Sequence, residues 1–429
     1  MRPLGKLGLA AATCLLAANF VAANFVAANV AIADTTVKWL HIEQNPAQVK
    51  IWEEVARDYE ASHPGVKLEM QFLENEAYKA KLPTILQSKD RPNIIYSWAG
   101  GVLKTQIEAG VLEDITDQVK GYGDSLTPAA LAAFTDNGRV YGLPISLSQV
   151  GFLCNRELMA KGKVDPAAIK SWDDLLSAVK TLKAAGVTPI VVGGADKWPL
   201  HFYWTHLAVR IGGKPAFDAA LRGENGGFAG ETFRKSGELF KQLVDLQPFQ
   251  NGFLGFKNPQ AVGYFGDGKA AMTLAISSVY HLQRALAADK VGLSEDKICW
   301  FDFPGVAGGK GAPTDTLGGI TGWLITKGSP KEAVDFLKYF ISKDVQTRLA
   351  ARNFIIPVVK GAEAGLNNSF MKLIASNLAK SNYHQNFYDQ SLGPSVGRVV
   401  NDVTAEIAGG SMSPQDAADA IEAARKQGN

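Results

Sequence analysis

Cysteine, histidine and one-sided charge are all scarce in this chain of 429 residues. It has three cysteines and six histidines, and its 44 basic residues nearly balance its 42 acidic ones. Because there is no long basic run, nucleic acid is not an expected partner. His201 and His206 are not spaced to share one face of a helix, and neither Cys154 nor Cys299 has metal-ligand spacing. We therefore predict neither a metal nor a cofactor.

Long apolar runs are also missing after the first 33 residues. Within that segment Arg2 and Lys6 are the only charges, an apolar run follows, and residues 31–33 have the small-x-small pattern of a signal-peptidase site. Asparagines interrupt the run, which argues against a permanent membrane helix. The pattern predicts a signal peptide over 1–33, cleaved near Ala33, and a mature protein in the periplasm.

The length of the mature chain predicts two domains, because single cores of this size are uncommon. Removal of residues 1–33 takes two of the 44 basic residues and none of the 42 acidic ones, so the mature chain is neutral. Cys154 and Cys299 lie in the apolar contexts FLCN and ICWF. Such a pair forms a disulfide in some exported proteins and stays as buried free thiols in others, so both readings stay open.

Strand-like and helix-like segments alternate along the start of the mature chain. Residues 37–42, 66–72 and 93–98 have the apolar patterns of strands. After the first of these, Asn45 and Pro46 form a helix cap with proline at the first helical position. A strand, helix, strand, helix, strand order is typical of an α/β sheet.

Residues 137–155, NGRVYGLPISLSQVGFLCN, are the central stretch of the chain. The stretch opens with an Asn-Gly turn signal and ends in an apolar run, with Gly142 and Pro144 between them. It predicts a strand, a break at the glycine and proline, and a second strand. Such a break suits a chain that leaves one sheet and enters another.

The alternation resumes after this stretch. Ser171 and Asp174 have the pattern of a capping box that opens a helix through Leu182. The further expected elements are a strand over 189–192, a helix over 198–213, strands over 270–276 and 317–326, and helices that start at the Ser-Pro pairs 329–330 and 413–414.

Ligands of open α/β sheets bind beyond the carboxyl ends of the strands. Hydrogen-bonding side chains alternate there with aromatic rings, which suits a sugar, because its hydroxyl groups need donors and acceptors and its C–H faces pack on rings. Trp98 also fits a core position, and both readings are kept. The candidates at these ends are His41, Glu43, Gln44, Glu76, Tyr78, Ser97 and Trp98.

Three patterns resemble catalytic motifs but are incomplete. Residues 393–397 fit G-x-S-x-G, yet the hydrolase order requires a histidine after the serine, and the last histidine is His384. Residues 305–311 lack the spacing and the Ser or Thr of a phosphate loop. Glu53 and Glu54 read as a solvated helix face rather than a glycosidase pair. We therefore predict a protein that is not an enzyme.

Several segments occur in an informative order across nearly the whole mature chain. They are DRPNIIYSWAGG, GVLEDIT, NGRVYGLPISLSQVGFLCN, SWDDLLSAVKTLKAAGVTPI, YFGDGKAAMTLAISSVY, SPKEAVDFLKYF and RNFIIPV. In this order they resemble the extracellular solute-binding proteins of ATP-binding-cassette (ABC) importers, in the carbohydrate-binding group that includes maltose-binding protein.

The resemblance implies an α/β, two-lobed periplasmic-binding-protein fold with a hinge and a ligand cleft between the lobes. It implies an N-terminal lobe of residues 34–143 and 318–360 and a C-terminal lobe of residues 144–317 and 361–429. Chain crossings are expected near 141–146, 315–319 and 357–363. By similarity, the ligand-binding candidates also include Ser146, Trp198, His201, Trp204, Ser277, Tyr280, Gly319, Arg352, Tyr388 and Asp389. From residues alone, the aromatic group that starts at Trp198 is more often core than site.

The implied function is capture of a carbohydrate by a monomer that delivers it to the membrane permease of the importer. Hinge closure over the ligand is the implied mechanism. One alternative keeps this role for a polyol, a sugar acid, an amino-acid derivative or a metal chelate. The other alternative is an exported carbohydrate-active hydrolase, which needs a carboxylate pair or a serine with a downstream histidine. The sequence shows neither arrangement.

Overall fold

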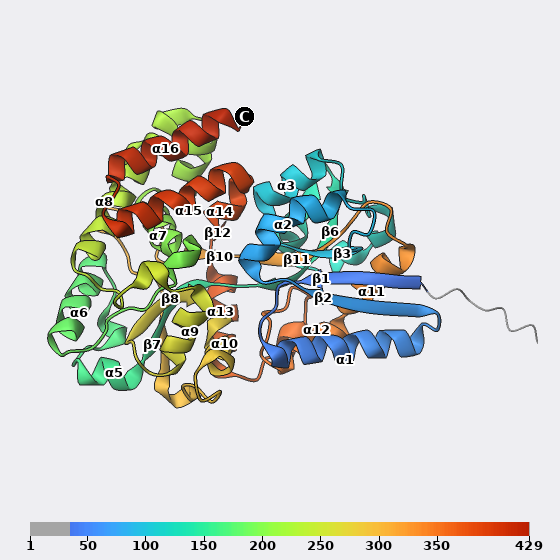
Figure 1. Cartoon of the computed structure of the whole chain (residues 1–429), viewed down its shortest axis with the longest axis horizontal. Coiled ribbons are helices and arrows are strands. Elements are labelled where there is room, and N and C mark those ends of the chain that lie inside the picture. The colour runs from blue at the N-terminus through green and yellow to red at the C-terminus, as the bar shows by residue number, and fades with distance from the viewer. Residues whose placement is uncertain (1–34, 429) are drawn as a thin grey trace, which may run out of the picture.

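Two separate β-sheets, each with helices packed around it, form two lobes that lie side by side (Figure 1). The computed structural model describes residues 35–428, so the predicted signal peptide lies outside the described residues. The N-terminal lobe contains a five-stranded sheet and the C-terminal lobe a three-stranded one. The predicted two-lobed α/β fold is confirmed.

The sheet of the N-terminal lobe has the order β2-β1-β3-β11-β6. β1 is parallel to β2 and β3, whereas β11 is antiparallel to both of its neighbours. Since β11 comes from a late part of the chain, the lobe is assembled from two distant segments. The strands are β1 (Thr35–His41), β2 (Val66–Phe72), β3 (Ile94–Ser97), β6 (Gly142–Leu147) and β11 (Ile320–Ile325).

Aromatic rings form the core on one face of this sheet. The ring of Trp39 lies 5.5 Å from Trp52, 5.0 Å from Trp323 and 5.5 Å from Phe340, centroid to centroid. All four side chains are buried, and each such burial stabilises the fold by about 2–3 kcal/mol. The helices of this lobe are α1 (Pro46–Ser62), α2 (Asn75–Gln87), α3 (Gly100–Glu108), α4 (Pro128–Ala132), α11 (Lys331–Phe340) and α12 (Lys343–Ala351).

The sheet of the C-terminal lobe has the order β8-β7-β9, and both strand pairs are antiparallel. The central strand β7 is buried at every residue, which explains its unbroken apolar run. β10 and β12 form a short parallel pair beside this sheet. The strands are β7 (Val150–Asn155), β8 (Met272–Ile276), β9 (Ile298–Phe301), β10 (Thr316–Gly318) and β12 (His384–Asn386).

Helices make up most of the C-terminal lobe. The predicted capping box is present at the start of α6, where Ser171 and Asp174 each accept a backbone hydrogen bond of the other. The helices are α5 (Arg156–Lys161), α6 (Trp172–Ala184), α7 (Trp198–Leu221), α8 (Glu231–Asp245), α9 (Asn258–Gly266), α10 (Val279–Leu286), α13 (Ser369–Lys380), α14 (Tyr388–Ser391), α15 (Gly393–Gly409) and α16 (Pro414–Gln427). None of the helices in residues 35–428 is long and apolar enough to cross a membrane.

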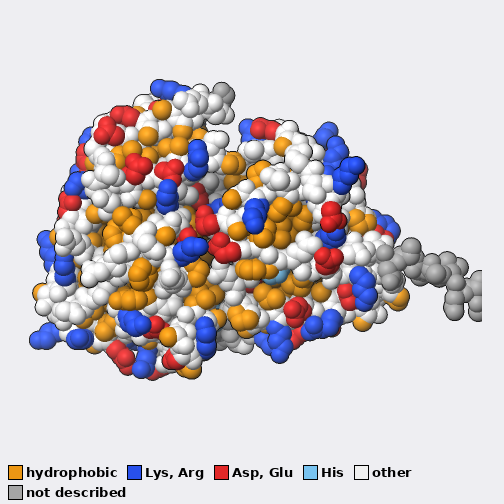
Figure 2. All heavy atoms as spheres, in the orientation of Figure 1, with side chains coloured by type: hydrophobic (Ala, Val, Ile, Leu, Met, Phe, Trp, Pro, Cys, Tyr) orange, Lys and Arg blue, Asp and Glu red, His pale blue; other side chains and the backbone are white. Residues whose placement is uncertain are grey.

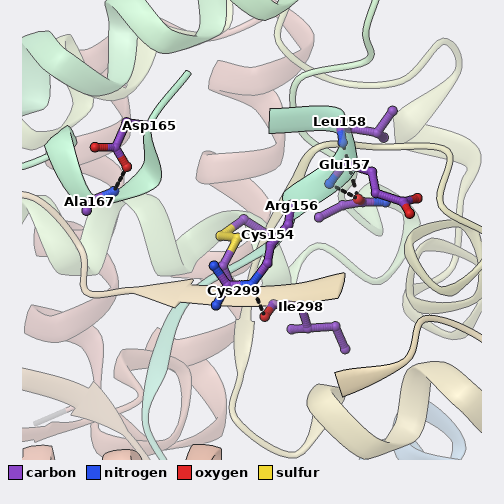
Figure 3. Close-up of a disulfide and its surroundings, with 9 residues drawn as sticks. Cys154, Arg156, Glu157, Leu158, Asp165, Ala167, Ile298 and Cys299 are labelled. Carbon is purple, nitrogen blue, oxygen red and sulfur yellow. Dashed lines mark hydrogen bonds between the residues drawn. A yellow bond between two sulfur atoms is a disulfide. The ribbon is translucent and has the colours of Figure 1, made fainter. Parts of the chain in front are cut away.

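Cys154 and Cys299 form a disulfide, which decides between the two readings of the sequence (Figure 3). They are directly opposite residues of β7 and β9, with Cα atoms 4.8 Å apart. Beside the bond, Arg156 donates a hydrogen bond to the Ile298 carbonyl at 3.1 Å. The bond therefore joins two strands that are 145 residues apart in the sequence.

The central stretch crosses between the lobes later than the sequence suggests. Pro144 is not in a break but inside β6, where it pairs with Gly322. β6 is an edge strand, so the missing N–H of proline leaves no ladder bond unmade. The chain leaves this sheet at Ser148 and Gln149, between β6 and β7. The Asn-Gly turn, at 137–138, joins β4 (Thr135–Asp136) to β5 (Arg139–Val140), and both turn residues have positive φ, as such hairpins require.

The expected strand over 189–192 is reduced to single bridges. Ile190 bridges to Phe249 and to Met272, but no ladder extends from it. Pro189, which has no N–H to donate, limits pairing at one end. The expected strand over 317–326 is two strands, because β10 lies in the C-terminal lobe and β11 in the N-terminal one.

Candidate ligand-binding cleft

A cavity of about 200 Å³ lies between the two lobes. The N-terminal lobe contributes the ends of β1 and β3 and the start of α2, and the C-terminal lobe contributes the starts of α7 and α14 and parts of α9 and α10. Charged side chains of both signs gather along the boundary of the lobes in Figure 2. The lining residues are Ile42, Glu43, Gln44, Trp52, Asn75, Lys79, Tyr96, Trp98, Trp198, His201, Phe202, Asn258, Ile276, Ser278, Leu282, Phe387, Asp389 and Gln390.

Glu43 and Gln44 reach the cavity because the chain turns sharply between β1 and α1. Asn45 caps α1, and its own amide donates a hydrogen bond to Glu43 Oε1 at 2.7 Å. Burial raises the pKa of Glu43 to about 7, although hydrogen bonds from the amides of Asn45 and Gln44 act in the opposite direction. Glu43 therefore changes its charge near neutral pH while it faces the cavity.

Trp98 is both a core residue and part of the cavity wall. The core position and the ligand-site position predicted from the sequence therefore both apply to it. Its ring packs edge-on against Tyr96 at 5.0 Å and Tyr78 at 5.9 Å, and 9% of its surface stays exposed. The Tyr78 hydroxyl donates a hydrogen bond to the Tyr96 carbonyl at 2.5 Å, which attaches α2 to β3. These contacts hold the indole in one orientation at the cleft.

Lys79 occupies the middle of the cleft, although the sequence patterns do not single it out. Its ammonium lies 5.5 Å from the ring centroid of Trp98 and 6.0 Å from that of Trp198, which belongs to the opposite lobe. The same nitrogen lies 3.6 Å from Asp389 Oδ2 and 3.5 Å from Glu76 Oε1. Lys79 thus connects the two lobes through a charge pair and two aromatic rings.

Asp389 is the C-terminal partner of this contact, and its side chain is only 6% exposed. Burial by itself would raise the pKa of Asp389, but the charge of Lys79 and a 3.3 Å hydrogen bond from Asn401 contribute to holding that pKa below its usual range. His201 Nε2 lies 3.8 Å from Asp389 Oδ1, and burial lowers the pKa of His201. The cleft therefore holds an ionised Asp389 beside a neutral imidazole at neutral pH.

This arrangement suits binding of a polar molecule with apolar faces. Indole rings come from opposite walls, and carboxylates, amides and an ammonium group lie between them. Within residues 35–428 no cluster of three or more His, Cys, Asp or Glu side chains has the arrangement of a metal site.

Six of the residues expected from the sequence line this cavity. They are Glu43, Gln44, Trp98, Trp198, His201 and Asp389. Glu76 and Tyr78 line a second, neighbouring cavity. The remaining candidates line neither cavity, and they are His41, Ser97, Ser146, Trp204, Ser277, Tyr280, Gly319, Arg352 and Tyr388.

The aromatic residues outside the cleft are core residues. Trp204 donates a hydrogen bond to the Phe233 carbonyl at 3.1 Å and packs edge-on against Tyr388. Tyr280 stacks on Phe370 with centroids 4.0 Å apart. A pattern of apolar residues does not distinguish rings that face another helix from rings that face a cleft.

The polar candidates outside the cleft have local roles. His41 packs edge-on against the ring of Trp52, and Ser277 Oγ accepts a 3.4 Å hydrogen bond from the Gln149 amide. Arg352 is exposed after α12. The carbonyl of Gly319 accepts a hydrogen bond from the Ser148 amide at 3.0 Å, which joins two chain crossings.

Several cleft residues were not expected from the sequence. Of these, Lys79 has the clearest signal, because it lies three positions after Glu76 on the same face of α2. Phe387 and Gln390 flank the expected pair of Tyr388 and Asp389. Because the short helix α14 starts here, neighbouring residues point in different directions, and Phe387 and Gln390 line the cleft whereas Tyr388 does not.

The family model described as bacterial extracellular solute-binding protein matches residues 44–347. The chain belongs to this family. This confirms the family resemblance of the sequence segments and a role in binding rather than catalysis. Because the family is one of extracellular proteins, membership also agrees with a protein that works outside the cytoplasm.

Relatives of this solute-binding protein share modest identity with it. A multiple sugar-binding protein of Streptococcus mutans is 24% identical over 332 residues, which is 74% of each chain. An uncharacterized ABC transporter extracellular-binding protein of Pyrococcus horikoshii is 27% identical over 182 residues. That match spans only 42% of the length of the Pyrococcus relative.

Solved structures resemble the solute-binding protein over most of its length. One, from work on xylan utilization by Caldanaerobius polysaccharolyticus, has a TM-score of 0.83 and 26% identity, and covers 90% of this chain and 99% of its own. A chitin oligosaccharide binding protein has a TM-score of 0.83 at 24% identity, and covers 92% and 99%. The two-lobed architecture is therefore shared along nearly the whole described chain.

Proposed function

We propose that this solute-binding protein captures a carbohydrate between its lobes and delivers it to the membrane permease of an ABC importer. One observation carries the proposal: Trp98 and Trp198, from opposite lobes, flank the Lys79 ammonium at 5.5 and 6.0 Å. Sugar C–H faces pack on such rings while hydroxyl groups bond to the charges between them. The Streptococcus mutans relative, whose name states multiple sugar binding, supports the same ligand class.

The proposed mechanism is closure of the lobes around the sugar. Residues 148–149 and Gly319 connect the two sheets and are the proposed hinge. Closure brings the Lys79 and Asp389 side chains together from opposite lobes, so ligand binding and lobe contact stabilise the same form. The closed form is then the one that the permease recognises. No covalent chemistry is required.

The bounds of the lobes, the cellular location and the oligomeric state are part of the same proposal. We place the N-terminal lobe at residues 34–147 and 319–360 and the C-terminal lobe at 150–318 and 361–429, because β6 belongs to the N-terminal sheet and β10 pairs with β12. The proposed location is the periplasm, after cleavage near Ala33, and the proposed working form is a monomer. Mass spectrometry of the exported protein tests the cleavage site, and light scattering tests the monomer.

A thermal-shift screen of the mature protein tests the ligand class. The panel contains mono-, di- and oligosaccharides, polyols and sugar acids, because a ligand that binds only the folded state raises its melting temperature. Sugar acids are included because the ammonium of Lys79 is a cation to which a carboxylate binds. A shift with a neutral sugar supports the proposal, and a shift only with a polyol, a sugar acid or an amino acid changes the ligand and keeps the role.

Two tryptophan variants separate binding from folding. Trp98→Ala should weaken sugar affinity at least about tenfold, because a stacked ring contributes about 1–3 kcal/mol to such contacts. Trp172→Ala, which removes a ring that packs on Phe303 outside the cleft, is the matched control and should keep the affinity. Equal affinities of Trp98→Ala and the wild type would contradict the proposed site.

A further inference from the structure

A second cavity, larger than the cleft, adjoins it on one side. Its volume is about 480 Å³, against about 200 Å³ for the cleft. The two cavities share Lys79, Trp98, Asp389 and Gln390 in their walls, so each opens beside the other at Trp98. The two spaces are therefore neighbours, and the side chains that both of them touch lie between them.

The wall of this second cavity is mainly apolar, and more so than that of the cleft. α2 contributes Leu82, Pro83 and Leu86, and the region of α3 contributes Val102 and Val111. Hydrophobic side chains gather over α2 beside the lobe boundary in Figure 2. The charged residues Lys79 and Asp389 line both the cavity and the cleft, and Glu76 and Arg398 line the cavity alone. Water finds few hydrogen-bond partners in such a space, whereas an apolar group that moves there from solvent is stabilised.

Two polar side chains of the wall, those of Gln106 and Asn401, each have a buried oxygen without a hydrogen-bond partner among the described residues. Gln106 is 8% exposed, and its buried Oε1 accepts no hydrogen bond from any described residue. Both oxygens are enclosed by protein atoms rather than exposed to the cavity, so they set no requirement for a donor on a bound molecule. The complementary occupant is thus largely apolar, as the wall is.

Further closure of the lobes does not remove this cavity. The cavity lies between α2 and α3 of one lobe and α15 of the other. At their first turns α3 and α15 already touch backbone to backbone, since a Cβ on Gly101 would lie 2.5 Å from the Gly393 nitrogen. Asn386 of the C-terminal lobe also donates a 3.0 Å hydrogen bond to the Trp98 carbonyl. The helices therefore cannot approach more closely on this side.

We infer that the natural ligand is a glycoside whose sugar occupies the cleft and whose bulky apolar aglycone occupies the second cavity. Exposed residues at the rim, among them Ala80, Ala109 and Arg398, leave the cavity open to solvent, so an aglycone larger than one ring system fits. This inference rests on the proposed function for the sugar part. It goes beyond that function in assigning an apolar group to the ligand.

The test compares glycosides that differ only in the aglycone. Isothermal calorimetry with methyl and 2-naphthyl glycosides of the same sugars should show at least about tenfold tighter binding of the naphthyl member, because its ring leaves water. Free 2-naphthol, an apolar bicycle with one hydroxyl donor, should bind one to one at submillimolar concentration without any sugar.

Three variants locate the binding. Ala80→Trp and Ala109→Trp add a ring to the cavity lining, on α2 and at the end of α3, and should weaken naphthol binding at least about tenfold and reduce the naphthyl preference. Ala61→Trp adds the same ring at an exposed position on α1, which lines neither cavity, and should change neither quantity.

The outcomes separate this inference from the proposed function. Naphthol binding that is absent, or unchanged in both cavity variants, overturns the aglycone site whatever the sugar result. Tight methyl glycoside binding with weaker naphthyl glycoside binding also overturns it and leaves the carbohydrate proposal standing. Naphthol binding without binding of any glycoside overturns the carbohydrate proposal, and with it the link between cleft and cavity.

Discussion

Replacement of Lys79 should loosen the contact between the lobes. In the variant Lys79→Met the aliphatic stem is kept, but Asp389 loses the cation that lies 3.6 Å from its Oδ2. The Asp389 carboxylate is buried, so its negative charge is then left without a neighbouring cation. Glu76, the other carboxylate that contacts Lys79, is also negative and cannot neutralise it. Because Lys79 and Asp389 belong to opposite lobes, the loss falls on the closed form and not on either lobe alone.

The size of the effect follows from distance and exposure. Two unit charges 3.6 Å apart attract by about 1 kcal/mol in water and by about 5 kcal/mol at an effective dielectric constant of about 20. The Lys79 side chain is 27% exposed and that of Asp389 only 6%, so the pair lies between these limits. We expect a coupling of about 2 kcal/mol, or roughly 30-fold in ligand affinity if only the closed form holds the ligand.

A double-mutant cycle measures this coupling. Ligand dissociation constants are measured by calorimetry for the wild type, Lys79→Met, Asp389→Asn and the double variant. The double variant should lose less affinity than the sum of the two single losses, because it contains no unpaired carboxylate. Solution X-ray scattering without ligand should show a larger radius of gyration for Lys79→Met than for the wild type.

A control and a refuting result complete the design. Lys50→Met removes an exposed lysine of α1 and should leave affinity and radius unchanged. Additive single effects, with a coupling below about 0.5 kcal/mol, would refute the charge pair as a link between the lobes. An unchanged radius together with unchanged affinity in Lys79→Met would refute it independently.

Three further predictions concern the disulfide and two titrating groups. Replacement of Cys154 and Cys299 by alanine should lower the free energy of unfolding by about 3–5 kcal/mol, because the disulfide no longer closes a loop of 145 residues in the unfolded chain. Urea titration measures this change, and equal unfolding midpoints of the variant and the wild type would contradict it. Burial lowers the pKa of His384 from 6.5 to about 4. As the pH falls, the unfolded chain therefore binds a proton at this histidine before the folded chain does. The contribution of His384 to the free energy of unfolding is full above pH 6.5 and declines as the pH falls toward 4. Urea titrations at several pH values should show a slope that His384→Gln reduces by about 1 kcal/mol per pH unit, whereas an equal slope in the variant would exclude this histidine as a contributor. Burial raises the pKa of Glu43 to about 7, and the ionised carboxylate is the stronger acceptor, so sugar affinity measured by calorimetry should rise with pH through about 7 in the wild type and not in Glu43→Gln.

The first elements of the fold could be predicted because their signals are local. The expected strand over 66–72 coincides with β2, and α1 starts at Pro46 after the Asn45 cap as expected. Alternating burial and helix capping depend on residues a few positions apart, so a short window of sequence contains them.

Other elements could not be predicted from a short window because their partners are distant. Pro144 looks like a break until β6 is known to be an edge strand, and the apolar residues 189–192 look like a strand although only Ile190 finds bridge partners. Within the candidate site, the expected Trp98 lines the cleft, whereas the expected Trp204 is core. Composition is the same in both cases, and only packing distinguishes them.

By itself the sequence determined the α/β alternation, the membership of the solute-binding family and the presence of aromatic and polar residues at strand ends. The tertiary structure alone decided that Cys154 bonds to Cys299, that Lys79 meets Asp389 across the lobes, and that an apolar cavity adjoins the cleft. The physical reason is that each of these features needs side chains from segments far apart in the chain. Their proximity depends on how sheets and helices pack, which no local pattern encodes.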